Sequence, residues 1–252
     1  MVHIVGAGCG AADLITVRGK KCLEEADIVI YAGSLINKEL LGYTKKGCEL
    51  YDSARMTLEE ILEIVEAGEN AGKMMVRLHS GDPSLYGAIG EQIREFEKLG
   101  IEYDITPGVS ALCGAAAALK TEYTLPDVSQ TVIISRVSGN TPVPGKEEIQ
   151  RLAAHQATMV LFLSTGLLEK AEQELIRGGY GENTPAAIVY KATWDDEKIC
   201  CCTVSTLKKT ADENGIKKTA LILIGDFLES DFKRSHLYDG HFSTEYREKK
   251  AD

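Results

Sequence analysis

The chain has 252 residues, which suggests one large domain or two modest ones. Its 38 aspartates and glutamates outnumber 28 lysines and arginines, giving a net charge of −10, and 44% of the residues are apolar. This balance is typical of a globular protein and excludes a disordered chain. A chain this acidic also lacks the basic surface with which proteins bind nucleic acid.

No stretch approaches the roughly 18 unbroken apolar residues of a membrane-spanning helix. Residues 1–6 contain no positive segment leading into an apolar stretch, so no secretory leader is predicted. The cysteines number seven, their spacing is irregular, and no CxxC pair occurs. We therefore expect a cytoplasmic protein without membrane contact, with free thiols and without a metal site.

Short β-branched runs alternate with helical stretches through the first half of the chain. Residues 56–69, for example, carry apolar side chains at the spacing of an amphipathic helix. Strands separated by helices indicate parallel pairing through right-handed crossovers. The predicted strands are 2–5, 28–31, 74–78 and 101–105, and the predicted helices are 20–26, 56–69, 85–99 and 109–119.

A polar segment at 122–127 contains Pro126, and we place a domain boundary there. The fold class is thus α/β, with domains at 1–125 and 126–252. Connections in the second domain are shorter, which allows antiparallel pairs. Its predicted strands are 131–135, 158–163, 186–190, 198–204 and 220–224, with helices at 146–153, 167–177 and 205–213. The charged tail from residue 229 onward carries Leu237, Tyr238, Phe242 and Tyr246, so we expect it to dock as an arm.

The first predicted strand leads directly into Gly6-Ala7-Gly8-Cys9-Gly10-Ala11, which matches the GxGxx(G/A) pattern of dinucleotide-binding folds. That fold needs a helix starting at the third position and an acidic residue at the end of the next strand. Here residues 12–16 intervene before the helix, and the second strand ends in Tyr31-Ala32-Gly33. The sequence therefore argues against a nicotinamide cofactor.

Two further glycine turns follow predicted strands, Gly81-Asp82-Pro83 after 74–78 and Pro107-Gly108-Val109-Ser110 after 101–105. Gly81 permits close approach of a ligand to the main chain, and Pro83 suits a first helical position. Asp82 is then either a helix N-cap or an acceptor for the ligand. Because parallel strands end at one sheet edge, the three turns predict a small-molecule site suited to an anionic group.

The sequence contains none of three common catalytic motifs, GxSxG, HExxH and GxxxxGK(S/T). The histidines show no metal-ligand spacing, and His79 alone adjoins a candidate site. No catalytic residue is predicted on these grounds.

The glycine turns, together with Asp13-Leu14-Ile15-Thr16, resemble those of the tetrapyrrole (corrin/porphyrin) methylases, which use S-adenosyl-L-methionine. The likeness runs from residue 2 to about 246. It is strongest to the branch that methylates C-11 of precorrin-4, or of its cobalt complex, in cobalamin biosynthesis. The segments that carry it are Tyr31-Ala32-Gly33-Ser34-Leu35, Gly81-Asp82-Pro83-Ser84-Leu85-Tyr86-Gly87-Ala88-Ile89, Ser129-Gln130-Thr131-Val132-Ile133, Thr141-Pro142-Val143-Pro144 and Val189-Tyr190-Lys191-Ala192-Thr193-Trp194.

The resemblance implies a homodimer whose two α/β domains hold S-adenosylmethionine in the cleft between them. The family's cofactor contacts fall on Cys9, Ser80, Gly81, Asp82, Leu85, Ser110, Ala111, Leu163, Ala192 and Ala220. One departure concerns the first loop, where the family continues as Gly-Pro-Gly-Asp-Pro and this chain has Gly8-Cys9-Gly10-Ala11-Ala12. Without the proline and the carboxylate we expect this loop to be less rigid.

A tetrapyrrole carries several carboxylates, so an acidic protein needs a locally basic site to bind it. The candidates for these contacts are Arg77, His79, Arg136 and Lys191, each of which has solvated surface charge as its alternative role. Tyr31 and Tyr86 offer flat apolar faces, and Ser34 leaves room for a bulky ring. Packing in the core is the alternative for both tyrosines.

Methyl transfer from a sulfonium needs alignment and exclusion of water rather than an acid–base pair, which agrees with the missing catalytic motifs. Three alternatives remain open: a methylase of another ring position, a diphthine synthase acting on a protein histidine, and a nucleotide-binding regulatory module without turnover. The sequence does not decide whether cobalt is already in the ring.

Overall fold

The structure is a computed structural model that describes residues 1–229, 231–233, 235, 238 and 241–248, apart from the side chain of Ser34. The chain forms two compact units: unit 1 holds Met1–Ala118 and Lys191–Glu197, and unit 2 holds Leu119–Tyr190 and Lys198–Asp252. That the chain divides into two separate domains after residue 125 stays a prediction. In the described part of the chain no helix is long and apolar enough to cross a membrane.

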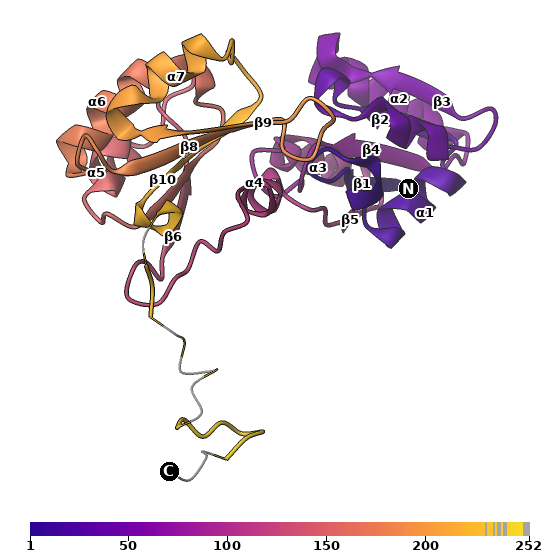
Figure 1. Ribbon diagram of the computed structural model, residues 1–252. Helices are drawn as coiled ribbons and strands as arrows, with labels where there is room; N and C mark the ends of the chain where they lie inside the picture. Colours follow the sequence, from indigo (N-terminus) through magenta and orange to yellow (C-terminus); the bar gives the residue numbers. More distant parts are fainter. Residues whose placement is uncertain (230, 234, 236–237, 239–240, 249–252) are drawn as a thin grey trace. The chain divides into compact units, whose positions relative to one another are not determined.

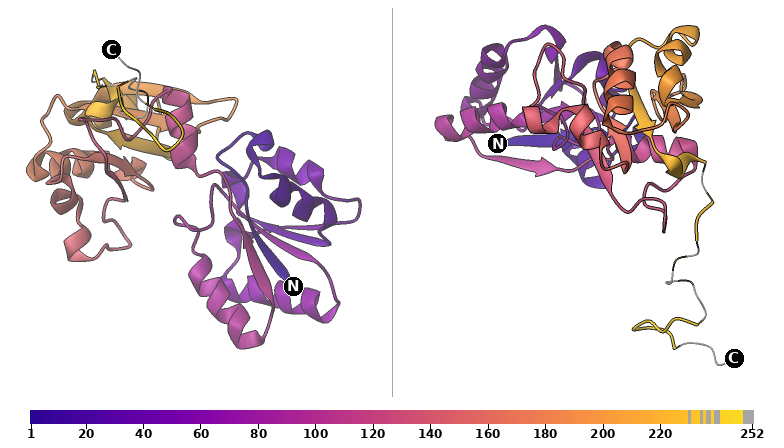
Figure 2. Two further views of the ribbon diagram at one scale, coloured as in Figure 1. Left: turned by 90° about the horizontal axis from the view of Figure 1, so that it is seen from below. Right: turned by 90° about the vertical axis from the view of Figure 1, so that its left-hand side faces the viewer.

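Unit 1 is built on a five-stranded parallel sheet in the order β3-β2-β4-β1-β5 (Figure 1, Figure 2). The parallel α/β arrangement expected from the sequence is therefore confirmed. Edge strand β3 was not predicted, because its sequence Glu-Leu-Tyr-Asp looks polar. The strands are β1 (Val2–Gly6), β2 (Ile28–Tyr31), β3 (Glu49–Asp52), β4 (Met75–His79) and β5 (Tyr103–Thr106), and the helices are α1 (Val17–Glu25), α2 (Leu58–Asn70), α3 (Ile89–Leu99) and α4 (Ala111–Leu119).

Both faces of this sheet are covered by helices. Val5 and Leu78 belong to one buried cluster with Leu23 of α1. Ile4, whose side chain points to the opposite face, belongs to a second cluster with Phe96 of α3. Because successive residues of a strand point to opposite faces, a sheet buried on both sides has strands that are almost continuously apolar.

Unit 2 contains a five-stranded mixed sheet in the order β6-β7-β10-β8-β9. Only β6 and β7 are parallel; the other neighbours pair antiparallel, which the short connections allow. The strands are β6 (Val132–Ser135), β7 (Thr158–Leu161), β8 (Pro185–Tyr190), β9 (Lys198–Thr203) and β10 (Ala220–Ile224), and the helices are α5 (Ile149–Ala153), α6 (Leu168–Gly178) and α7 (Leu207–Glu213).

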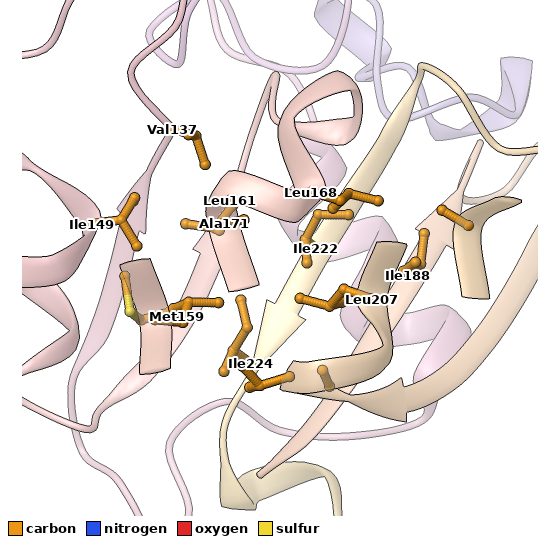
Figure 3. Close-up of a cluster of buried hydrophobic side chains, with 14 of the residues drawn as sticks. Val137, Ile149, Met159, Leu161, Leu168, Ala171, Ile188, Leu207, Ile222 and Ile224 are labelled. Carbon is orange, nitrogen blue, oxygen red and sulfur yellow. The ribbon is translucent and has the colours of Figure 1, made fainter. Parts of the chain in front are cut away.

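One buried cluster forms the core of unit 2 (Figure 3). Met159 and Leu161 of β7 and Ile222 of β10 contribute to it from the sheet, and Leu168 and Leu207 contribute from α6 and α7. Each of these side chains is at most 1% exposed. Burying a side chain of this size stabilises the fold by about 1.5–3 kcal/mol, so this cluster holds the helices on the sheet.

Helix α3 begins at Ile89, later than the predicted start at residue 85. The preceding residues Tyr86 and Ala88 have left-handed backbone, with φ of 57° and 51°, so no helix can pass through them. Asp82 is therefore not the N-cap of a helix, and that predicted role is wrong. The cause is the turn that separates it from α3.

The aromatic residues of the tail that the structure describes are exposed. Phe232 is 58% exposed, Tyr238 73% and Tyr246 92%, so these three rings are not buried against the chain itself. Leu237 lies outside the described residues. Docking of the tail stays a prediction.

We expect Gly108→Ala to lower the free energy of unfolding by about 1–3 kcal/mol, because overpacking a tight site costs this much. A Cβ at residue 108 would lie 2.2 Å from the carbonyl oxygen of Gly81. The control is Gly90→Ala, where an added Cβ meets nothing within 4 Å, and alanine favours a helix by about 1 kcal/mol. Denaturant unfolding of both variants tests this, and equal stabilities would contradict the close packing at Gly108.

Candidate functional site

Three loops at the carboxyl ends of β1, β4 and β5 contact one another through their backbones. Gly8 and Gly81 form a bridge in which the Gly8 amide donates over 3.2 Å and the Gly81 amide over 2.8 Å to the opposite carbonyl oxygens. A Cβ on Gly6 would lie 2.6 Å from Cα of Gly108. The glycine turns therefore meet at one sheet edge, as predicted. Glycine is required there mainly because the backbones of neighbouring loops touch.

Asp82 joins the second of these loops to the third. Its Oδ2 accepts from the Gly108 amide at 2.9 Å, and its Oδ1 accepts from the Ser84 amide at 2.9 Å. Partial burial by itself raises the pKa of the Asp82 carboxyl, but the hydrogen bonds from Ser84 and Gly108 hold it below the ordinary value. Asp82 is thus an ionised carboxylate with backbone partners on both oxygens.

The N-terminus of α4 lies beside the bare backbone of the second loop. An added Cβ on Gly81 would lie 3.5 Å from the Ala111 nitrogen, and Gly81 itself has φ of 61°. The hydroxyl of Ser110 accepts from the Leu112 amide at 3.2 Å. Among the described residues the Ala111 amide has no acceptor. Free amides at a helix N-terminus suit an anionic group.

The predicted cofactor contacts divide between the units. Most of them lie in unit 1: Cys9, Ser80, Gly81, Asp82, Leu85, Ser110, Ala111 and Ala192. The other two, Leu163 and Ala220, lie in unit 2. In unit 2, Leu163 follows β7 and is 69% exposed. Ala220 begins β10, which pairs antiparallel with β7 and has Ile222 opposite Leu161. Within each unit the predicted contacts therefore gather at strand or helix ends.

Residues distant in sequence hold the first loop. The side-chain amide of Asn37 donates to the Gly10 carbonyl oxygen at 3.1 Å, and the Ala11 amide donates to Oγ1 of Thr193 at 3.0 Å. A Cβ on Gly10 would lie 2.3 Å from Cδ1 of Trp194. The first loop thus has tertiary contacts, which we did not consider when we expected it to be less rigid. The sequence carried no signal for them, because they are set by tertiary packing.

A cavity of about 290 Å³, which we call the Arg77 pocket, opens in unit 1 beside β4. Polar and apolar side chains share its wall, and the polar ones include Arg77 and His79 of β4 and Gln92 of α3. The lining residues are Ala32, Leu35, Ser53, Met56, Leu58, Ile61, Arg77, His79, Ser80, Leu85, Tyr86, Gly87, Ala88, Glu91 and Gln92.

Arg77 is a buried cation without a carboxylate partner. Its side chain is 6% exposed; Nε donates to Oε1 of Gln92 at 2.9 Å and Nη1 to the Ile30 carbonyl at 3.2 Å. In the described part of the chain no acidic oxygen lies within 4 Å of the guanidinium, although exposed Glu91 lines the same pocket. Burial lowers the pKa of Arg77 to about 10, so it is charged at neutral pH. A buried unpaired charge is costly, and an anionic ligand would relieve it.

His79 lies two residues further along β4, on the same side of the strand. It is 5% exposed, and its Nε2 has no hydrogen-bond partner among the described residues. Burial, with a smaller effect of the Arg77 charge, lowers the pKa of His79 to about 3. The imidazole is therefore neutral and offers a hydrogen bond rather than the positive charge that a basic contact implies.

The predicted ring contacts lie in different surroundings. Tyr86 is 44% exposed and lines the Arg77 pocket. Tyr31, at the end of β2, packs partly buried against the core on the α1 face, its alternative role. Nothing is described of the Ser34 side chain, so its predicted role falls outside the described residues.

The two remaining predicted cations already have partners. In unit 2, Nη1 and Nη2 of Arg136 donate to the carbonyl oxygens of Thr141 and Pro142 at 2.8 and 2.9 Å. In unit 1, Nζ of Lys191 pairs with Asp196 at 2.6 Å and lies 5.3 Å from the ring centroid of Trp194. Both side chains therefore have a local structural role.

A second cavity, of about 500 Å³, lies in unit 1 beside the first loop. Among its lining residues are four carboxylates, from Asp13, Glu39, Asp195 and Asp196. Such a site repels an anionic ligand. Of the two cavities, the Arg77 pocket is thus the one that suits a carboxylate.

The cysteines are all free thiols. Cys9 is buried, and burial raises the pKa of its thiol, so it is uncharged at neutral pH. Within the described residues, no cluster of three or more histidine, cysteine or acidic side chains could hold a metal ion.

The α/β architecture and the loops at the sheet edge define a small-molecule-binding protein, and comparison with known proteins gives its family. The family model of the tetrapyrrole (corrin/porphyrin) methylases matches residues 1–208. The chain belongs to this family.

Relatives of known name match the chain over nearly its whole length. The cobalt-precorrin-4 C(11)-methyltransferase of Methanocaldococcus jannaschii is 55% identical over 98% of this chain and 95% of its own. The enzyme of the same name from Priestia megaterium is 45% identical over 98% of this chain and 97% of its own. The X-ray structure of a cobalt precorrin-4 methyltransferase matches with a TM-score of 0.89 and 46% identity, covering 91% of this chain and 96% of that one.

We expect the His79 ring to stay neutral throughout the range in which histidine ordinarily titrates. Below pH 6.5 the unfolded chain binds a proton at this residue, but the folded chain does not until about pH 3. Stability is therefore lost as the pH falls, by up to about 1.4 kcal/mol per pH unit. Relative to wild type, His79→Gln should gain about 2–3 kcal/mol of unfolding free energy between pH 7 and 4.5. NMR titration checks the ring directly, and a midpoint near 6.5 would contradict its burial.

Proposed function

We propose that this protein methylates C-11 of precorrin-4, or of its cobalt complex, with S-adenosylmethionine as the donor, in cobalamin biosynthesis. The observation that carries the proposal is 55% identity, over 98% of the chain, to an enzyme named for this reaction. A second relative of the same name at 45% identity supports it.

We infer that S-adenosylmethionine binds at the three loops of unit 1. The proposed contacts are Cys9, Ser80, Gly81, Asp82, Leu85, Ser110, Ala111, Leu163, Ala192 and Ala220. The site fits this molecule, because the free Ala111 amide at the start of α4 suits its carboxylate and Gly81 has no side chain in the way. When bound, the donor supplies a methyl group already activated by the sulfonium.

The Arg77 pocket is proposed to take one carboxylate arm of the macrocycle. At about 290 Å³ it is at the lower limit for a whole small ligand, so an arm rather than the ring would enter it. The guanidinium of Arg77 would then gain a counter-ion, and Nε2 of His79 a hydrogen-bond partner. Tyr86, Tyr31 and Ser34 are proposed ring contacts, and Arg136 and Lys191 outer contacts. No residue is assigned as a catalytic acid or base.

The proposal is tested by incubating the purified protein with ¹³C-methyl S-adenosylmethionine and either precorrin-4 or its cobalt complex. We expect one labelled methyl group, which NMR of the product places on C-11. The faster of the two substrates identifies the form used. A label on another carbon would mean a methylase of a different ring position. Binding of the donor without any transfer would support a regulatory module instead, and labelling of a protein histidine a diphthine synthase.

We also propose that the protein is a homodimer. The exposed aromatic residues of the tail, among them Phe232 and Tyr246, supply apolar surface for a second copy. Sedimentation at micromolar concentration should give about twice the 27.4 kDa of one chain. A monomer at that concentration would contradict the proposal.

A further inference from the structure

Thr193 has a backbone conformation that its residue type rarely adopts. Its φ is 69°, in the left-handed region, where a β-branched residue is a clear outlier. The amide of Thr193 donates to Oε2 of Glu197 at 2.6 Å, and the Trp194 amide donates to the Lys191 carbonyl at 3.0 Å. These bonds hold the strained turn, and such strain gathers at positions where function requires a side chain to point in one direction.

The hydroxyl of Thr193 contacts the first loop on both sides of Gly10. Its Oγ1 accepts from the Ala11 amide at 3.0 Å and lies 3.6 Å from Sγ of Cys9. A hydroxyl has two acceptor lone pairs and one proton, so it can satisfy both neighbours at once. One side chain therefore fixes the two residues that define the turn.

The packing around Gly10 makes this contact specific. A Cβ on Gly10 would lie 2.3 Å from Cδ1 of Trp194 and 2.6 Å from the carbonyl oxygen of Ala192. Gly8, directly before Cys9, is hydrogen-bonded through its backbone to Gly81 of the second loop. If the first loop moved where it contacts Thr193, the backbone of the second loop would therefore move with it.

We propose that Thr193 is a positioning residue of the methyl-donor site, which it serves by holding the Cys9–Ala11 turn in place. Cys9, Ala11 and Ala12 stand where the family pattern has proline, aspartate and proline, and the Thr193 hydroxyl supplies a side-chain contact to this turn. The inference rests on the proposed function, because the turn matters only if the donor binds there. Thr193 itself does not need to touch the donor.

The test compares Thr193→Val with Thr193→Ser in the full-length protein. Valine keeps the β-branched shape and the backbone strain but removes the acceptor, whereas serine keeps the hydroxyl. The matched control is Thr206→Val, because Oγ1 of Thr206 also accepts one backbone amide, that of Thr203, at 3.0 Å. Calorimetry with S-adenosylmethionine measures the dissociation constant, and hydrogen exchange measures protection of the Ala11 amide.

For Thr193→Val we expect the dissociation constant of the donor to rise about tenfold, as for a lost hydrogen bond that leaves the partly buried Ala11 amide unpaired. The KM for the donor should rise with it, while kcat at saturation and the KM for the tetrapyrrole stay within about twofold. Exchange at Ala11 should speed up. The serine variant and the Thr206→Val control should both bind within about twofold of wild type.

Unchanged donor affinity in Thr193→Val, or unchanged exchange at Ala11, would overturn the positioning role while leaving the proposed function intact. Equal losses in the serine and valine variants would also overturn it, because the hydroxyl would then not matter. If wild-type protein binds no S-adenosylmethionine, the proposed function fails first and this inference fails with it.

Discussion

Close approach of three backbones at one sheet edge is the constraint on which the candidate site depends. Gly6, Gly81 and Gly108 lie so near one another that a Cβ on Gly6 or Gly108 would fall within 2.7 Å of a backbone atom in a neighbouring loop. The loops can meet there only because parallel strands β1, β4 and β5 end side by side. Main-chain donors and acceptors then line this edge of the sheet, and Asp82 joins the second loop to the third.

The candidate site contains a buried positive charge although the protein as a whole is acidic. The chain carries a net charge of −10, yet Arg77 is a buried cation with two neutral hydrogen-bond partners. A local charge of this kind decides what binds, because burial strengthens its field while distant surface carboxylates are screened by solvent. The neutral imidazole of His79 beside it adds direction rather than charge. An acidic protein can in this way accept an acidic ligand.

Local sequence signals predicted the parallel sheet and the three glycine turns, because alternation of apolar runs and glycine placement are properties of neighbouring residues. The sequence did not predict β3, whose Glu49 and Asp52 mark it as polar, or the delayed start of α3 after left-handed Ala88. It also did not predict that Thr193 contacts the first loop. These features depend on contacts over long sequence separations, which periodicity does not record.

Main-chain loops and buried side chains divide the work of the site. In the proposed site the three loops would bind the donor through backbone groups, which every methylase of the family would share, so the loops would not choose a ring position. Choice requires side chains that differ in shape and charge, and in unit 1 these gather in the Arg77 pocket, where Tyr86 forms part of the wall. Arg77 and His79 lie in β4, and the Gly81 loop follows this strand directly. In the proposed site one strand would thus carry both the groups for the substrate arm and the loop for the methyl donor, and it would fix the distance between them, which alignment for in-line transfer requires.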